Sequence, residues 1–91
     1  MPYGPTDFDK LKWHYVAGIA GYVTDVGNHY WLATKYETAG PALVVVDCTQ
    51  KQPIEVIHEP TSTVTEVGQK KAWDRYLQLV SQGRVPEPSL P

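Results

Sequence analysis

The histidines and the single cysteine have the widest chemistry of any side chains in this sequence: His14, His29, His58 and Cys48. Three imidazoles can bind zinc when the fold brings them together. The histidines are 15 and 29 residues apart, however, and neither HxxxH nor HExxH occurs. We therefore predict no metal site and no bound cofactor.

A nucleophile is not indicated either. Cys48 ends a valine-rich run beside Asp47, whose negative charge disfavours a thiolate, so we expect a small buried residue there. With one cysteine, the chain has no intramolecular disulfide. Pro2 would act as an N-terminal base only if it were buried, and the Tyr3-Gly4-Pro5 segment that follows is typical of a loop.

Paired carboxylates and phosphate-binding loops give no stronger signal. Glu55 and Glu59 lie at either side of a predicted strand end, and Asp7 and Asp9 are explained by a helix start. The sequence has neither GxGxxG nor GxxxxGK[ST]. These observations favour a protein that is not an enzyme, and we predict no catalytic residue.

Aromatic residues form the one constellation that suggests a function. The chain has three Trp and six Tyr but one Phe, and Trp and Tyr combine large contact area with a polar tip. Most of them lie between positions 13 and 36, close to two histidines. We predict that this group forms a partner-binding surface made of Trp13, Tyr15, Tyr22, His29, Tyr30, Trp31 and Tyr36.

The elements that position these rings are predicted from turn signals and periodicity. Thr6 caps a short helix from Asp7 to about Trp13, and a strand continues through Val23. A turn over residues 25–28 leads to a strand over 29–36, which places Tyr22 opposite Trp31. The same residues allow an alternative, with one helix from Asp7 to about Ala20 and another from Thr24 to Gly40.

The second half of the chain has clearer patterns. A continuous apolar run over 43–48 predicts a central strand buried on both faces, and 54–58 returns after a polar turn. A capping box at Thr63 and Glu66 precedes an apolar stripe at helical spacing: Ala72, Trp73, Tyr76, Leu77 and Val80. We expect a helix from about Glu66 to Gln82 that stops at Gly83.

Together these elements predict a small α+β fold. An antiparallel sheet of three or four strands, arranged as two hairpins, carries a short N-terminal helix and a C-terminal amphipathic helix, and its other face stays open to solvent. Residues 1–5 are expected to be flexible, 6–83 to form one domain, and 84–91 to be a disordered tail. Pro88-Ser89-Leu90-Pro91 is a PxxP pattern, the kind of segment that docks on aromatic grooves, but no basic residue flanks it closely, so disorder is favoured.

Charge and hydropathy limit the partners. The chain has 91 residues and a net charge of −2, with one basic doublet, so nucleic acid is an unlikely partner. The longest apolar run, over 42–46, is far too short to span a membrane, and no secretory leader is visible. We expect a cytoplasmic protein of a bacterium or phage.

These observations favour a small non-enzymatic protein-binding module, an accessory, inhibitor or regulatory protein, that uses an aromatic-rich sheet surface. The alternative is a homo-oligomeric domain that binds a small molecule or acts as an enzyme, with its pocket between the sheet and the C-terminal helix.

Overall fold

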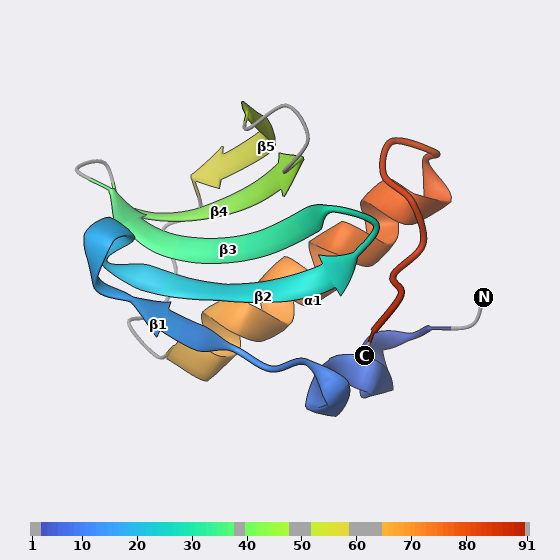
Figure 1. Cartoon of the computed structure of the whole chain (residues 1–91), viewed down its shortest axis with the longest axis horizontal. Coiled ribbons are helices and arrows are strands. Elements are labelled where there is room, and N and C mark those ends of the chain that lie inside the picture. Colours follow the sequence, from blue (N-terminus) through green and yellow to red (C-terminus); the bar gives the residue numbers. More distant parts are fainter. Residues whose placement is uncertain (1–2, 38–39, 48–51, 59–64, 91) are drawn as a thin grey trace.

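The computed structural model describes residues 3–37, 40–47, 52–58 and 65–90, with side chains for 3–35 and 66–90. Within these ranges a five-stranded sheet lies against one long helix (Figure 1). The α+β class, the antiparallel sheet, the short N-terminal helix and the C-terminal helix are confirmed. The sheet has one strand more than the largest number expected.

The sheet is a simple meander. Its strands are β1 (His14–Val16), β2 (Gly21–Gly27), β3 (Tyr30–Glu37), β4 (Gly40–Asp47) and β5 (Gln52–His58). Their order in space is their order in the chain, and all four neighbouring pairs are antiparallel. Helix α1 (Thr65–Ser81) runs behind the sheet in Figure 1 and leaves the face toward the viewer uncovered.

The N-terminal helix is the 3-10 helix η1 (Pro5–Lys10), two residues earlier than expected. Its N-cap is Gly4 rather than Thr6, because Pro5 fits the first helical position, where a missing N–H costs nothing. The backbone N–H of Gly4 donates to the Asp7 carboxylate at 2.7 Å. This hydrogen bond fixes the entry of the chain into η1.

The extra strand arises because the strand expected to run through Val23 is folded back on itself. A single 3-10 turn, η2 (Ala17–Ile19), ends at Ala20 in the left-handed conformation and separates β1 from β2. Tyr15 then pairs with Tyr22. Their rings meet edge to face with centroids 5.2 Å apart, a contact that stabilises the new hairpin.

The β2–β3 turn lies further along the chain than predicted. Its loop is Asn28-His29, both with positive φ (57° and 67°), after a bulge that ends at Gly27. Two-residue hairpin loops favour positive φ at both positions because their twist then matches that of the strands. His29 is therefore in the loop and not in the strand. The predicted pairing of Tyr22 with Trp31 is wrong, since Tyr22 lies opposite Thr34.

The second hairpin forms as predicted over β4 and β5. Strand β4 is internal, between β3 and β5. The side chains of β4 are not among those that the structure describes, so the expected burial on both faces is not tested. The turn residues 48–51 lie outside the described residues. Pro53 occupies the edge strand β5, where a missing ladder hydrogen bond is tolerated.

Among the described side chains, helix α1 supplies most of the core. Ala72, Trp73, Tyr76 and Leu77 are buried as the stripe predicts, and Leu79 of the same helix is buried outside the stripe. They pack with residues from β2, β3 and the C-terminal segment: Val26, Leu32 and Val85. The helix ends at Gly83, whose φ is +74°. The N–H groups of Gly83 and Arg84 donate to the carbonyls of Val80 and Leu79, which is a Schellman cap.

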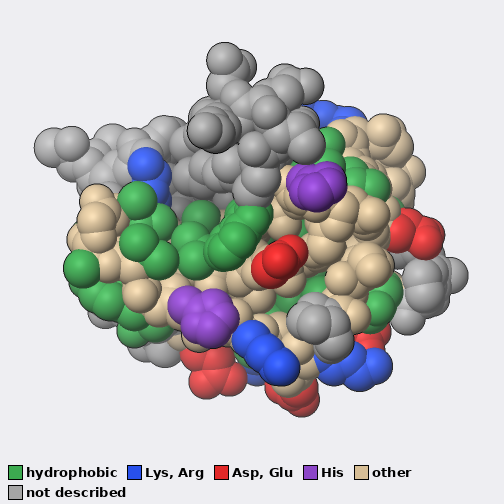
Figure 2. All heavy atoms as spheres, in the orientation of Figure 1, with side chains coloured by type: hydrophobic (Ala, Val, Ile, Leu, Met, Phe, Trp, Pro, Cys, Tyr) green, Lys and Arg blue, Asp and Glu red, His purple; other side chains and the backbone are tan. Residues whose placement is uncertain are grey.

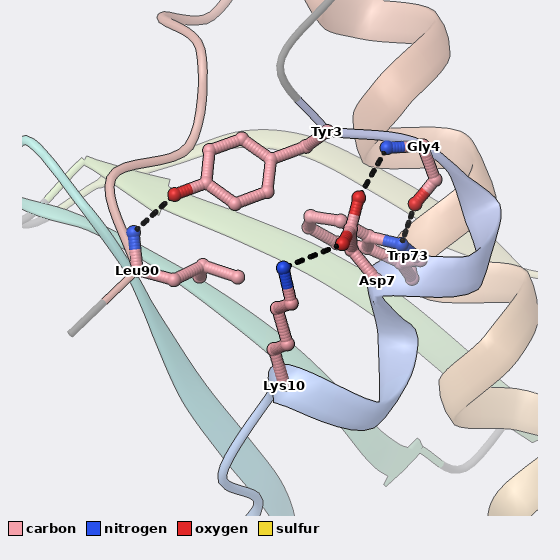
Figure 3. A network of polar contacts seen from close by, with 6 residues as sticks. All are labelled: Tyr3, Gly4, Asp7, Lys10, Trp73 and Leu90. Carbon is pink, nitrogen blue, oxygen red and sulfur yellow. Dashed lines mark hydrogen bonds and ion pairs between the residues drawn. The ribbon is translucent and has the colours of Figure 1, made fainter.

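The C-terminal segment differs from the expected disordered tail. It has no helix or strand, but Val85 and Pro88 are buried and the backbone N–H of Ser89 donates to the Val26 carbonyl at 2.9 Å. Tyr3 and Gly4, expected to be flexible, are also engaged in contacts (Figure 3). The composition of residues 84–91 indicates that they lack regular structure. It does not predict their contacts, because the residues that they contact are distant in sequence.

Candidate functional site

The two faces of the sheet can be assigned from register and burial. Thr24 and Val26 on β2 and Leu32 on β3 are buried, so their side chains lie on the face covered by α1. Alternation places the residues between them on the opposite, open face. Trp31 is on that open face, opposite Asp25.

Several of the predicted binding residues lie on the covered side. Tyr22 has the parity of Thr24, and Tyr30 packs against the buried core. Trp13, which precedes β1, also packs against the core. Tyr15 shares a face with Tyr22, but because β1 is an edge strand its side chain is 60% exposed. The predicted aromatic group is therefore divided between two faces rather than gathered on one.

The open face carries a smaller apolar surface, which we call the open-face patch and define as Val16, Val23 and Trp31. Ala33 has the same parity as Trp31 but is only 4% exposed. Val23 lies directly opposite Ala33 in the register. Trp31 is 36% exposed and Val16 37% exposed. Figure 2 shows hydrophobic side chains gathered on this side of the molecule, with charged side chains and histidine beside them. The register puts polar residues at the margin of the patch: His14, Asp25 and Lys35.

The remaining predicted residues are placed apart. His29 is exposed in the β2–β3 loop, and His14 is exposed on β1. Tyr36 and His58 are described only as backbone positions of β3 and β5. Pro2 and Cys48 lie outside the described residues. Within the described part of the chain, no three His, Cys, Asp or Glu side chains lie close enough to hold a metal ion.

A polar network joins the two ends of the chain (Figure 3). The Trp73 indole N–H donates to the Gly4 carbonyl at 3.1 Å. The Asp7 carboxylate accepts the Gly4 N–H and pairs with Lys10 at 3.0 Å, and these contacts hold the pKa of Asp7 below its ordinary value. The Leu90 N–H lies 3.4 Å from the Tyr3 hydroxyl. Sequence patterns did not indicate the Trp73–Gly4 and Leu90–Tyr3 contacts, because these partners are 69 and 87 positions apart along the chain.

Among the described side chains, two buried polar atoms on the covered side have no hydrogen-bond partner: the Trp13 indole Nε1 and the Thr24 Oγ1. Thr24 is 1% exposed. A buried hydroxyl without a partner costs free energy, so this position weakens the core.

A shallow hollow of about 230 Å³ lies between η1 and α1. Its walls include Phe8 and Trp73, and the Lys70 ammonium lies 5.7 Å from the centre of the Phe8 ring. The hollow is smaller than the usual ligand pocket of roughly 300–1,000 Å³. It is bordered by two helices, whereas the small-molecule alternative placed a pocket between the sheet and α1.

Comparison of the chain with protein-family models, curated proteins and solved structures gives no match. Among the described helices, none has both the length and the apolar character needed to cross a bilayer. The site is therefore interpreted from its own geometry.

Proposed function

We propose that this chain is a small cytoplasmic, non-enzymatic protein-binding module, an accessory, inhibitor or regulatory protein. It contacts its partner through the open face of the sheet. The observation that carries the proposal is Trp31, a large ring left 36% exposed on a face that α1 does not cover.

The surroundings of Trp31 support a contact role. Interface anchors are enriched in Trp and Tyr, and they work best where neighbouring apolar groups exclude water. Val23 lies at the centre of the open-face patch, and Val16 lies at the β1 edge. Asp25 faces solvent beside Trp31. A fitting partner presents an apolar side chain to the patch and a basic group to Asp25.

Tyr15 does not extend this surface. It is 60% exposed at the β1 edge, but its ring packs on Tyr22 on the other side of the sheet. The partner-binding residues that the geometry supports best are therefore Trp31 and the two valines Val16 and Val23. Tyr30 and Trp13 pack instead against the core between the sheet and α1, and the Tyr22 ring contacts Tyr15.

The experiment compares three forms of the tagged chain expressed in its native host: wild type, Trp31→Ala, and Gln78→Ala as the matched control on the exposed side of α1. A partner identified with wild type is then purified and titrated against each form. We expect binding to weaken at least ~10-fold for Trp31→Ala, the effect of losing an interface anchor, and to stay unchanged for Gln78→Ala. If Trp31→Ala and wild type are both folded and bind the partner with equal affinity, the open face is not the contact surface.

A further inference from the structure

The segment from Val85 to Leu90 is held in the way a bound peptide is held. It forms no helix or strand. The rest of the protein contacts it through hydrogen bonds to the backbone atoms of the segment and through its buried apolar side chains. Tyr76 donates its hydroxyl to the Pro86 carbonyl at 2.9 Å. Asn28 donates its side-chain amide to the Glu87 carbonyl at 2.9 Å.

This pattern of donors suits a proline-containing ligand. Proline has no N–H, so an extended proline-rich chain presents mainly carbonyl acceptors. A tyrosine hydroxyl and an asparagine amide are side chains that can donate to such carbonyls. The hydroxyl of Tyr76 also remains protonated, because burial raises its pKa.

Gly27 allows the segment to approach the sheet closely. Its φ is +85°, and a Cβ built there would lie 2.5 Å from the Ser89 carbonyl oxygen. On the same side the Ser89 N–H donates to the Val26 carbonyl. Pro88 is buried, and Leu90 packs against the core. The β2–β3 turn, Tyr76 and Tyr3 thus form a groove with a defined register for an extended chain.

We infer that this groove is a recognition site for an extended, proline-containing segment of a partner protein, and that residues 85–90 occupy it as an internal ligand. The occupant is argued from the seated segment, which shows the pattern that fits: a buried proline at position 88, two preceding carbonyls that accept hydrogen bonds from Tyr76 and Asn28, and a leucine two residues after the proline. The site is separate from the open-face patch.

The connection to α1 permits release of the internal ligand. Residues 81–84 are exposed, and a Cβ at Gly83 would meet nothing within 4 Å. Rotation at this junction would release the segment through the loss of the two capping hydrogen bonds of Gly83 and Arg84 and of the buried position of Val85. Because the junction is short, the internal ligand competes at an effective concentration of millimolar order or above. The wild-type groove is therefore closed to weaker external ligands.

The test uses the full-length chain with Pro88→Asp, which places a charge at a buried tail position and leaves the groove residues intact. The probe is the synthetic peptide VPEPSLP, residues 85–91 of this chain. Glu87→Gln is the matched control, because the groove contacts the Glu87 backbone carbonyl and the side chain is exposed. Binding is followed by NMR shifts at Asn28 and Tyr76.

We expect the peptide to bind Pro88→Asp at least ~10-fold more tightly than wild type or Glu87→Gln, and adding Asn28→Ala to Pro88→Asp should weaken it again. If Pro88→Asp is folded but does not bind the peptide, the inferred recognition site is wrong. If the wild-type chain forms a dimer with exchanged C-terminal segments under the same conditions, the groove binds a second copy of this chain, and the inference of a different partner protein is wrong.

Hydrogen exchange of the wild-type chain keeps the inference testable if Pro88→Asp does not fold. The Ser89 amide should exchange at least ~10-fold faster than the Tyr76 amide, because a releasable segment opens locally. Exchange of both amides at one rate, through global unfolding alone, would show that residues 85–90 are a permanent part of the core and would overturn the inference.

Discussion

Leu32 and Trp31 are neighbours on β3, but they belong to opposite faces of the sheet. Leu32 is fully buried against α1, whereas Trp31 is 36% exposed on the open face. The covered face is closed by a helix and by both ends of the chain, while the open face keeps apolar surface in contact with solvent. One strand can therefore stabilise the fold through the side chains on its covered face and present a contact surface through those on its open face.

The largest effect is expected on the covered side, at Trp73. Its ring is fully buried, stacks parallel to Tyr76 at 6.3 Å, and its indole N–H binds the Gly4 carbonyl. Trp73→Ala should lower the free energy of unfolding by about 3–5 kcal/mol, measured by urea denaturation. Trp31→Ala should cost less than about 1 kcal/mol. A similar loss in the free energy of unfolding for the two variants would show that the open face contributes as much to stability as the covered face.

Gly21 tests how closely two strands approach at an open-face position. A Cβ there would collide with the Thr34 carbonyl oxygen and with Lys35 on β3. Gly21→Ala should destabilise the protein by about 1–3 kcal/mol through overpacking. Gly18→Ala, where a Cβ would meet nothing within 4 Å, is the control and should leave the thermal midpoint nearly unchanged.

Asp7 gives a pH-dependent test of the N-terminal closure of the covered face. The Gly4 N–H and then Lys10 lower the folded-state pKa of Asp7 below 3.8. Its contribution is therefore fully present above the unfolded pKa and is lost as pH falls through the folded pKa. Asp7→Asn should be less stable than wild type at pH 7, and the gap should shrink below about pH 4. A gap that stays constant from pH 7 to pH 2 would contradict this role.

The smallest change is expected at Thr24, within the covered face. Its hydroxyl is buried without a hydrogen-bond partner in the structure. Valine has nearly the same shape, so Thr24→Val should leave stability unchanged or raise it by up to about 1 kcal/mol in urea denaturation. A loss of more than 1 kcal/mol would mean that the hydroxyl is satisfied, for instance by a buried water.

The parts of the fold that depend on local pattern were predictable. The apolar stripe gave helix α1 within one residue at each end, and Gly83 marked its stop. The β2–β3 register could not be predicted, because it depends on both Asn28 and His29 adopting positive φ, a conformation that is uncommon for any residue other than glycine.

That register decides which aromatic residues share a face, so the candidate site could be predicted only in part. Trp31 is a predicted contact residue and is 36% exposed on the open face, while Tyr22 and Tyr30 lie on the covered side. The groove around residues 85–90 was beyond sequence reasoning. Asn28 reaches a carbonyl 59 residues away, and composition cannot report such a contact.

The meander order has a consequence for how the chain folds. Since every strand pairs with the strand next to it in sequence, each hairpin closes only a short loop, and the sheet can grow by successive hairpins at low entropic cost. The contact between Tyr3 and Leu90 spans 87 positions. We expect it to be the slowest contact to form, so that the sheet is assembled before the two ends of the chain meet.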